Sequence, residues 1–190
     1  MPKMIKIING QIYGSPPDDL SYIGGRGILG RLILPMTRFM RYSNVKKYII
    51  PSERLLDIGC GDAYFLQKIN CREKYGIDKL MGEEITDKLD FPDNYFDYIT
   101  MLAVIEHVKK PDEIISEIHR ALKPGGKFIF TTPRKSAEKL IRLYAKDIDS
   151  EHESYFDYEK VEKLAAGLFR IYGFNTFIFG MNQVFALEKI

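Results

Sequence analysis

Cysteine is scarce in this chain of 190 residues, as are long apolar runs and net charge. Two cysteines, Cys60 and Cys71, are too few for a disulfide framework or a four-ligand zinc site. No His, Cys or carboxylate cluster has the spacing of metal ligands, so we expect no metal. No apolar run approaches the roughly 18 residues of a membrane span, and the N-terminus lacks the pattern of a signal peptide. By default these absences favour a cytoplasmic protein.

The charge is unevenly distributed, although its sum is only +2. Residues 1–50 carry eight Lys/Arg against two Asp/Glu, while the rest of the chain is mildly acidic. We therefore expect a basic N-terminal arm on an acidic body, and no general case for nucleic-acid binding.

The pattern of the chain predicts one α/β domain, with strands and helices alternating from about residue 53. Short strands are expected in 54–59, 74–79, 95–102 and 127–133, and helices from 63 and over 111–122. Such alternation is typical of a doubly wound, Rossmann-like, mostly parallel sheet, here expected to have seven strands.

The two ends of the domain depart from this alternation. Residues 1–50 are expected to form a basic N-terminal cap or arm, whose helical part is one or two amphipathic helices in 24–49 interrupted near Pro35. Residues 134–157 are expected to form a cap insert. The cofactor-binding core is then 51–133. In 158–190 we expect a helix that stops at Gly173, followed by an antiparallel hairpin with its turn at Gly180–Asn182.

The segment LLDIGCGDAYFL, residues 55–66, is the main candidate binding loop, because ligands of open α/β sheets bind at the carboxyl ends of strands. A dinucleotide fingerprint would need a third glycine where Tyr64 stands, and no Gly-Lys-Ser/Thr of a P-loop follows. The carboxylate of Asp57 would repel a pyrophosphate and attract a cation. S-adenosylmethionine carries an ammonium and a sulfonium and no phosphate, and it suits this loop.

Asp78 lies 21 residues beyond Asp57, at the end of the next expected strand. A carboxylate at that position can accept hydrogen bonds from both hydroxyls of a ribose. This feature alone suits NAD equally well. Together with Asp57 and Tyr64, it favours the methyl donor.

Five segments in this order resemble the class I S-adenosylmethionine-dependent methyltransferases, especially the type 11 group: LLDIGCGDA, YGIDK, DKLDFPDNYFDYI, AVIEHV and LKPGGKFIFTTP. The resemblance implies S-adenosylmethionine as cofactor and S-adenosylhomocysteine as product. It also implies that the cofactor-binding residues are Asp57, Gly59, Cys60, Gly61, Asp78, Asp87 and Ala103. Asp87 would meet the adenine, and Ala103, with Val104, the methionine side. The family often has glycine where this chain has Ala63.

Catalysis is harder to locate, because methyl transfer mainly requires alignment and the exclusion of water. His107 follows the strand expected at 95–102 and is a candidate base near neutral pH, as is Glu106 beside it; the alternative is that this Glu-His pair holds the loop. His152 lies in the cap insert and is either a substrate contact or base, or an exposed loop histidine.

The expected function is methyl transfer to a small-molecule or lipid- or glycan-linked acceptor. Basic segments near the expected pocket mouth favour an anionic or lipid-linked acceptor. The N-terminal helix either packs on its own domain or makes a peripheral membrane contact. Two alternatives stay open, an NAD-dependent oxidoreductase and a non-catalytic protein of the same fold that binds S-adenosylmethionine. A nucleic-acid substrate is not expected, and the sequence does not indicate an oligomeric state.

Overall fold

The fold is described from a computed structural model. It covers residues 4–14, 28–78, 88–135 and 155–190, and for residues 28–34 it describes the backbone alone. The strands are β1 (Ile5–Ile8), β2 (Gln11–Tyr13), β3 (Ser52–Ile58), β4 (Cys71–Ile77), β5 (Phe96–Leu102), β6 (Leu122–Pro133), β7 (Phe169–Phe177) and β8 (Asn182–Lys189). The helices are α1 (Ile28–Lys46), α2 (Tyr64–Lys68), α3 (Pro111–Ala121) and α5 (Tyr158–Ala165), with a 3₁₀ turn, η2 (Ile105–His107).

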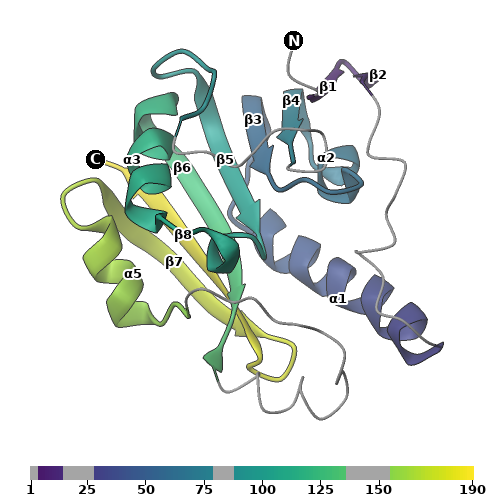
Figure 1. The fold of residues 1–190 in the computed structure, drawn as a ribbon. Helices are drawn as coiled ribbons and strands as arrows, with labels where there is room; N and C mark the ends of the chain where they lie inside the picture. The colour runs from purple at the N-terminus through teal and green to yellow at the C-terminus, as the bar shows by residue number, and fades with distance from the viewer. Residues whose placement is uncertain (1–3, 15–27, 79–87, 136–154) are drawn as a thin grey trace.

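These strands form one twisted sheet in the order β2-β1-β4-β3-β5-β6-β8-β7 (Figure 1). The four central strands, β4, β3, β5 and β6, run parallel, and an antiparallel hairpin flanks them on each side. The chain proceeds from β3 to β4 in one direction and from β5 to β6 in the other. The order therefore reverses between β3 and β5. This is the topological switch point at which such sheets bind their ligands.

The predicted doubly wound α/β fold is confirmed, but the sheet has eight strands among the described residues instead of the expected seven. The difference arises at the N-terminus, where the expected cap or arm contained helices in 24–49 and no strand. There β1 and β2 form a hairpin that pairs with β4. Its turn is Asn9-Gly10, and both residues have positive φ, at 48° and 82°. Asn-Gly between two short runs is a strong hairpin signal that could have been recognised.

Two helix boundaries also differ from the expectation. The C-terminal helix ends at Ala165 instead of Gly173, because Gly167 takes a left-handed φ of 77° and the chain then enters strand β7. In the N-terminal region a single helix, α1, continues through Pro35 instead of breaking there.

Helix α3 shows why the expected helix over 111–122 forms. Pro111 stands in its first turn, where a missing N–H costs nothing, and Asp112 and Glu113 follow near the positive end of the helix dipole. Its apolar side chains recur at helical spacing and are buried: Ile114, Ile115, Ile118 and Ala121. The helix ends where Leu122 begins β6.

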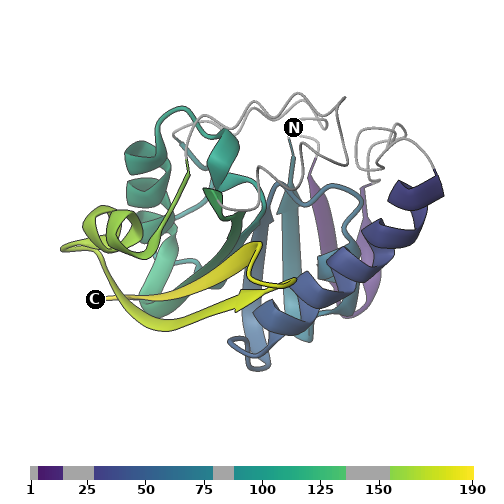
Figure 2. The same cartoon turned by 90° about the horizontal axis from the view of Figure 1, so that it is seen from below.

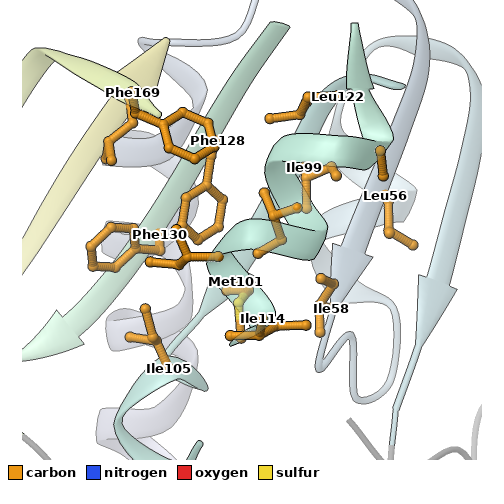
Figure 3. Close-up of a cluster of buried hydrophobic side chains, with 14 of the residues drawn as sticks. Leu56, Ile58, Ile99, Met101, Ile105, Ile114, Leu122, Phe128, Phe130 and Phe169 are labelled. Carbon is orange, nitrogen blue, oxygen red and sulfur yellow. The ribbon is translucent and has the colours of Figure 1, made fainter. Parts of the chain in front are cut away.

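Helices cover both faces of the sheet (Figure 2). Helices α3 and α5 bury one face in a core of aliphatic and aromatic side chains, shown in Figure 3. Helices α1 and α2 cover the other face with a second apolar cluster. Two hydrogen bonds join β7 to the end of α1 and the turn after it: Asn175 Nδ2 donates to Asn44 Oδ1 of α1 (3.1 Å), and Tyr172 Oη donates to Tyr48 O just beyond the helix (3.3 Å).

Candidate cofactor site

The turn after β3 lies at the switch point and places its two glycines against neighbouring strands. Gly59 N donates to Ile77 O of β4 (2.8 Å), and Gly61 N donates to Asp78 Oδ2 (2.9 Å). Gly59 has a φ of 76°, and a Cβ on it would lie only 2.2 Å from Val104 Cγ2. Glycine is therefore needed at this position both for its backbone conformation and for the close approach of the chain after β5.

Asp57, at the end of β3, is buried in the fold, with 2% of its surface exposed. Its Oδ1 accepts a hydrogen bond from Thr100 Oγ1 of β5 (2.7 Å). Burial raises the pKa of this carboxyl from 3.8 to about 7; the neighbouring Asp78 acts in the same direction, and the Thr100 hydroxyl and Arg41 oppose both. A cationic ligand group at this point would favour the ionised carboxylate.

Three other residues that were expected in the site, Ala103, Cys60 and Asp78, make different contacts. Ala103 has a φ of 61° and its N–H donates to Thr131 O (2.9 Å), which keeps the chain after β5 beside the glycine turn. Cys60 contributes backbone to the turn, whereas its thiol is buried against Gly76 and burial raises its pKa. Asp78 is buried, and its Oδ2 accepts the hydrogen bond from Gly61 N; its expected contact with a ribose stays a prediction.

Ala63 has a left-handed φ of 60°, which gives a physical reason for the glycine that the family often has at this position. A non-glycine residue in this conformation costs about 1–2 kcal/mol. The Ala63 side chain is nevertheless buried in the cluster under α1 and α2. The methyl group is therefore accommodated, and the turn keeps its shape.

The α1 helix supplies two arginines to this site, neither of which was among the expected site residues. Arg38 Nη2 pairs with Asp62 Oδ1 in the glycine turn (2.6 Å), and its guanidinium lies over the Tyr64 ring. Arg41 lies one turn further along α1, close enough to Glu106 and Asp57 for their charges to interact. Burial lowers the pKa of Arg41, and these two carboxyls oppose that effect. Helical spacing places both arginines on one side of α1, but only the tertiary contacts show which side faces the strand ends.

The described residues contain four buried polar side-chain atoms without a hydrogen-bond partner: Arg41 Nε, Glu106 Oε2, Thr131 Oγ1 and Thr132 Oγ1. They come from α1, the turn η2 and the end of β6, the elements around the ends of β5 and β6. Each unpartnered buried group costs about 1–3 kcal/mol. Arg41 and Glu106 lie close enough for their charges to interact, so the unpartnered atoms of these two side chains fit a polar ligand that satisfies them.

The described residues say little about the candidate catalytic side chains. His107 is exposed at the end of η2, whereas Glu106 beside it is 2% exposed and burial raises its pKa. His152 and Asp87 lie outside the described residues, so their expected roles stay predictions. Within the described ranges, no group of three His, Cys, Asp or Glu side chains could hold a metal ion. No described helix is long and apolar enough to cross a membrane.

Comparison with known proteins assigns the family. A family model described as a methyltransferase domain matches residues 33–175, which cover the switch point and most of the sheet. The chain belongs to this methyltransferase family. The resemblance to class I S-adenosylmethionine-dependent methyltransferases is thereby confirmed, and the dinucleotide alternative loses its support.

Two curated relatives are similar to part of the chain. The chain is 32% identical over 104 residues to a ubiquinone/menaquinone biosynthesis C-methyltransferase of Pseudomonas paraeruginosa, which covers 43% of this chain and 41% of that protein. It is 44% identical over 55 residues to a demethylmenaquinone methyltransferase of Symbiobacterium thermophilum, covering 29% and 22%. The chain thus spans about two fifths of the first relative and less of the second.

Solved structures agree on the fold. A SAM-dependent methyltransferase from Aquifex aeolicus superimposes with a TM-score of 0.65 at 18% identity, covering 90% of this chain and 99% of that one. The [4+2]-cyclase SpnF superimposes with a TM-score of 0.59 at 16% identity, covering 93% and 86%. A cyclase among these neighbours shows that this fold hosts more than one chemistry, so the reaction has to be argued from the site.

Proposed function

We propose that this protein binds S-adenosylmethionine at the carboxyl ends of β3, β4 and β5 and transfers its methyl group to a small acceptor. The bound cofactor would supply an electrophilic methyl on a good leaving group. The residues of the chain then have to bind the cofactor and the acceptor, orient them toward each other and exclude water. Their main contribution is therefore positioning.

The observation that carries this proposal is the pair of buried carboxyls, Asp57 and Asp78, on either side of the glycine turn. Asp57 stands where a pyrophosphate would be repelled and an ammonium attracted. Asp78 stands at the end of the adjacent parallel strand, where carboxylates hold ribose hydroxyls. Family membership supports the same assignment.

For the acceptor we propose a quinone-type ring that is methylated on carbon. The support comes from the two relatives, whose names state ubiquinone, menaquinone and demethylmenaquinone chemistry. On carbon, the new C–C bond forms as the C–S bond breaks, and the acceptor loses a proton. Glu106 is a candidate to receive that proton, because its carboxyl is buried, burial raises its pKa, and it lies in the turn η2 that follows β5.

The test is calorimetric titration of the purified protein with S-adenosylmethionine, S-adenosylhomocysteine and NADH. We expect micromolar binding of the first two and none of NADH. Asp78→Ala should abolish binding, because it removes both the ribose acceptor and the anchor of Gly61. Asp78→Asn keeps an oxygen for Gly61 N, and should weaken binding less.

Binding of NADH alone would overturn the proposal. If the two methyl-donor ligands bind, incubation with labelled S-adenosylmethionine and a demethylated quinone tests the acceptor. Binding without methyl transfer to any acceptor would favour the alternative of a non-catalytic protein of the same fold.

A further inference from the structure

The turn between β7 and β8 presents an aromatic side chain to solvent. Phe179 is 97% exposed, whereas Phe177 and Ile178 before it are buried in the apolar cluster under α1 and α2. A single exposed apolar residue is common on protein surfaces and needs no explanation by itself. Phe179 differs in its backbone conformation and in its surroundings.

The backbone holds Phe179 in this exposed place at a steric cost. Ile178, Phe179 and Gly180 have φ angles of 51°, 53° and 76°, and glycine or asparagine is the ordinary choice in such a turn. A β-branched and an aromatic residue are both unfavourable there. The turn is nevertheless fixed by two hydrogen bonds, from Met181 N to Ile178 O (3.0 Å) and from Arg134 N to Met181 O (2.9 Å). Strained residues of this kind cluster at functional positions.

The turn lies at the same edge of the sheet as the candidate cofactor site. Asn182, the first residue of β8, pairs with Pro133, the last residue of β6 (Figure 1). The turn before Asn182 therefore stands beyond the carboxyl end of β6, on the side of the sheet edge where β3, β4 and β5 also end.

The charges beside the turn are positive. Arg134 and Lys135 follow β6 and are exposed, and a Cβ on Gly180 would lie 3.8 Å from Arg134 Nη1. The two segments that meet here, 128–135 and 176–183, contain no Asp or Glu. An exposed aromatic ring beside two cations complements a bilayer with anionic headgroups, because the ring enters the interface while the cations face the phosphates.

We propose that the β7–β8 turn is a membrane contact, in which Phe179 inserts at the surface of an anionic bilayer and Arg134 and Lys135 bind its headgroups. This inference goes beyond the proposed function, and it places the contact on the turn instead of the N-terminal helix. Because the turn lies at the edge of the candidate site, the same contact brings that site to the bilayer, in which a lipid-linked acceptor is dissolved.

The test is co-sedimentation of the full chain with vesicles of phosphatidylcholine and phosphatidylglycerol, compared with vesicles of phosphatidylcholine alone. The wild type should bind the anionic vesicles more strongly, and salt should weaken this binding because it screens the charges. Phe179→Ser should lower the partition coefficient about 10-fold, because a large apolar side chain no longer leaves water. Arg134→Gln and Lys135→Gln should each lower it about fivefold.

The matched control is Phe39→Ser on α1, because the Phe39 side chain is also exposed, at 60%. This variant should bind vesicles as the wild type does, which separates the turn from the helix. Thermal melting shows that each variant is folded. Phe179→Ser should melt close to the wild-type temperature, because an exposed side chain contributes little to stability.

Three outcomes would overturn the inference. The first is that the wild type does not bind anionic vesicles, or binds them no better than neutral ones. The second is that Phe179→Ser binds like the wild type, or that Phe39→Ser loses as much binding. The third is that sedimentation velocity shows a dimer that Phe179→Ser dissociates, because the partner of the ring is then a second copy of the chain. The titration with S-adenosylmethionine decides the proposed function separately from all three.

Discussion

The two faces of the sheet carry different kinds of side chain, although the same strands supply both. Toward α3 and α5 the central strands place Leu56, Ile99 and Phe130, which are fully buried in the apolar core. The next residue of each strand points to the opposite face: Asp57, Thr100 and Thr131. Both sets lie close to the carboxyl ends of the strands. Strand alternation thus lets one segment supply stability on one face and a polar site on the other.

This comparison separates residues that fold the protein from residues that bind its ligand. Apolar side chains should affect the free energy of unfolding and leave affinity unchanged. Polar side chains at the strand ends should affect affinity, and those that are poorly solvated should even lower stability. Three substitutions test this separation, in order of decreasing effect.

The apolar face is tested by Phe130→Ala. Phe130 is fully buried and stacks between Phe128 and Phe185, with ring centroids 5.1 Å away in each case. Removing the ring should lower the free energy of unfolding by about 3–5 kcal/mol, measured by urea denaturation. The variant, titrated well below its melting temperature, should bind S-adenosylhomocysteine within about twofold of wild type, since no binding group is lost. A tenfold loss of affinity in the folded variant would contradict the separation of the two faces.

The polar face is tested by Asp57→Asn across pH. A carboxyl whose pKa rises from 3.8 to about 7 on folding favours the native state at low pH, and this contribution is lost as pH rises through about 7. At about 1.4 kcal/mol per pKa unit, the advantage of the variant should grow from near zero at pH 4 to about 4 kcal/mol at pH 8. Urea denaturation of the wild type and of Asp57→Asn between pH 4 and pH 8 measures this difference in the free energy of unfolding.

The same substitution should weaken ligand binding, because the ligand ammonium loses the carboxylate that it neutralises. Thr100→Val is the matched control: it removes the hydroxyl that donates to Asp57 but keeps the charge. It should raise the pKa of Asp57 further. Identical dependence of stability on pH for wild type and Asp57→Asn would contradict the assigned burial.

The smallest effect is expected for Ala63→Gly. Glycine relieves a left-handed conformation that costs alanine about 1–2 kcal/mol, but it removes a buried methyl group worth about 0.8 kcal/mol. The net result should be a stabilisation of up to about 1 kcal/mol, read from the urea midpoint, with affinity unchanged. Gly61→Ala, at a φ of 52°, is the reverse control and should destabilise the turn. Destabilisation by Ala63→Gly would mean that packing outweighs backbone strain.

Much of the fold follows from local patterns. The parallel strands and α3 lie close to their expected positions, because burial on both faces and helical spacing leave direct signals in the sequence. The N-terminal hairpin was not predicted, because a basic arm was expected there. The Asn9-Gly10 turn is nevertheless a local signal for it. The predicted end of helix α5 was too late in the chain, because apolar residues of β7 continue the helical spacing beyond Gly167.

For the site, the residues on adjacent strand ends were predictable and those on other elements were not. Asp57, Gly59, Gly61 and Asp78 follow consecutive parallel strands, so the fold class alone brings them together. Arg41 was not among the expected site residues, because it belongs to the amphipathic helix expected in the N-terminal cap or arm. Nothing in its spacing shows that α1 lies over the strand ends with this side chain turned inward.

The sequence by itself determined the α/β class, the chemistry of the glycine turn and the preference for a cation over a phosphate, because these depend on residues close together in the chain. Only the tertiary structure decided that Arg41 lies close enough to Glu106 and Asp57 for their charges to interact. It also decided that Asp57 is buried enough to change its pKa, and that Ala63 takes a left-handed conformation. The physical reason is that desolvation and charge pairing depend on which distant segments pack together, and local spacing does not contain that information.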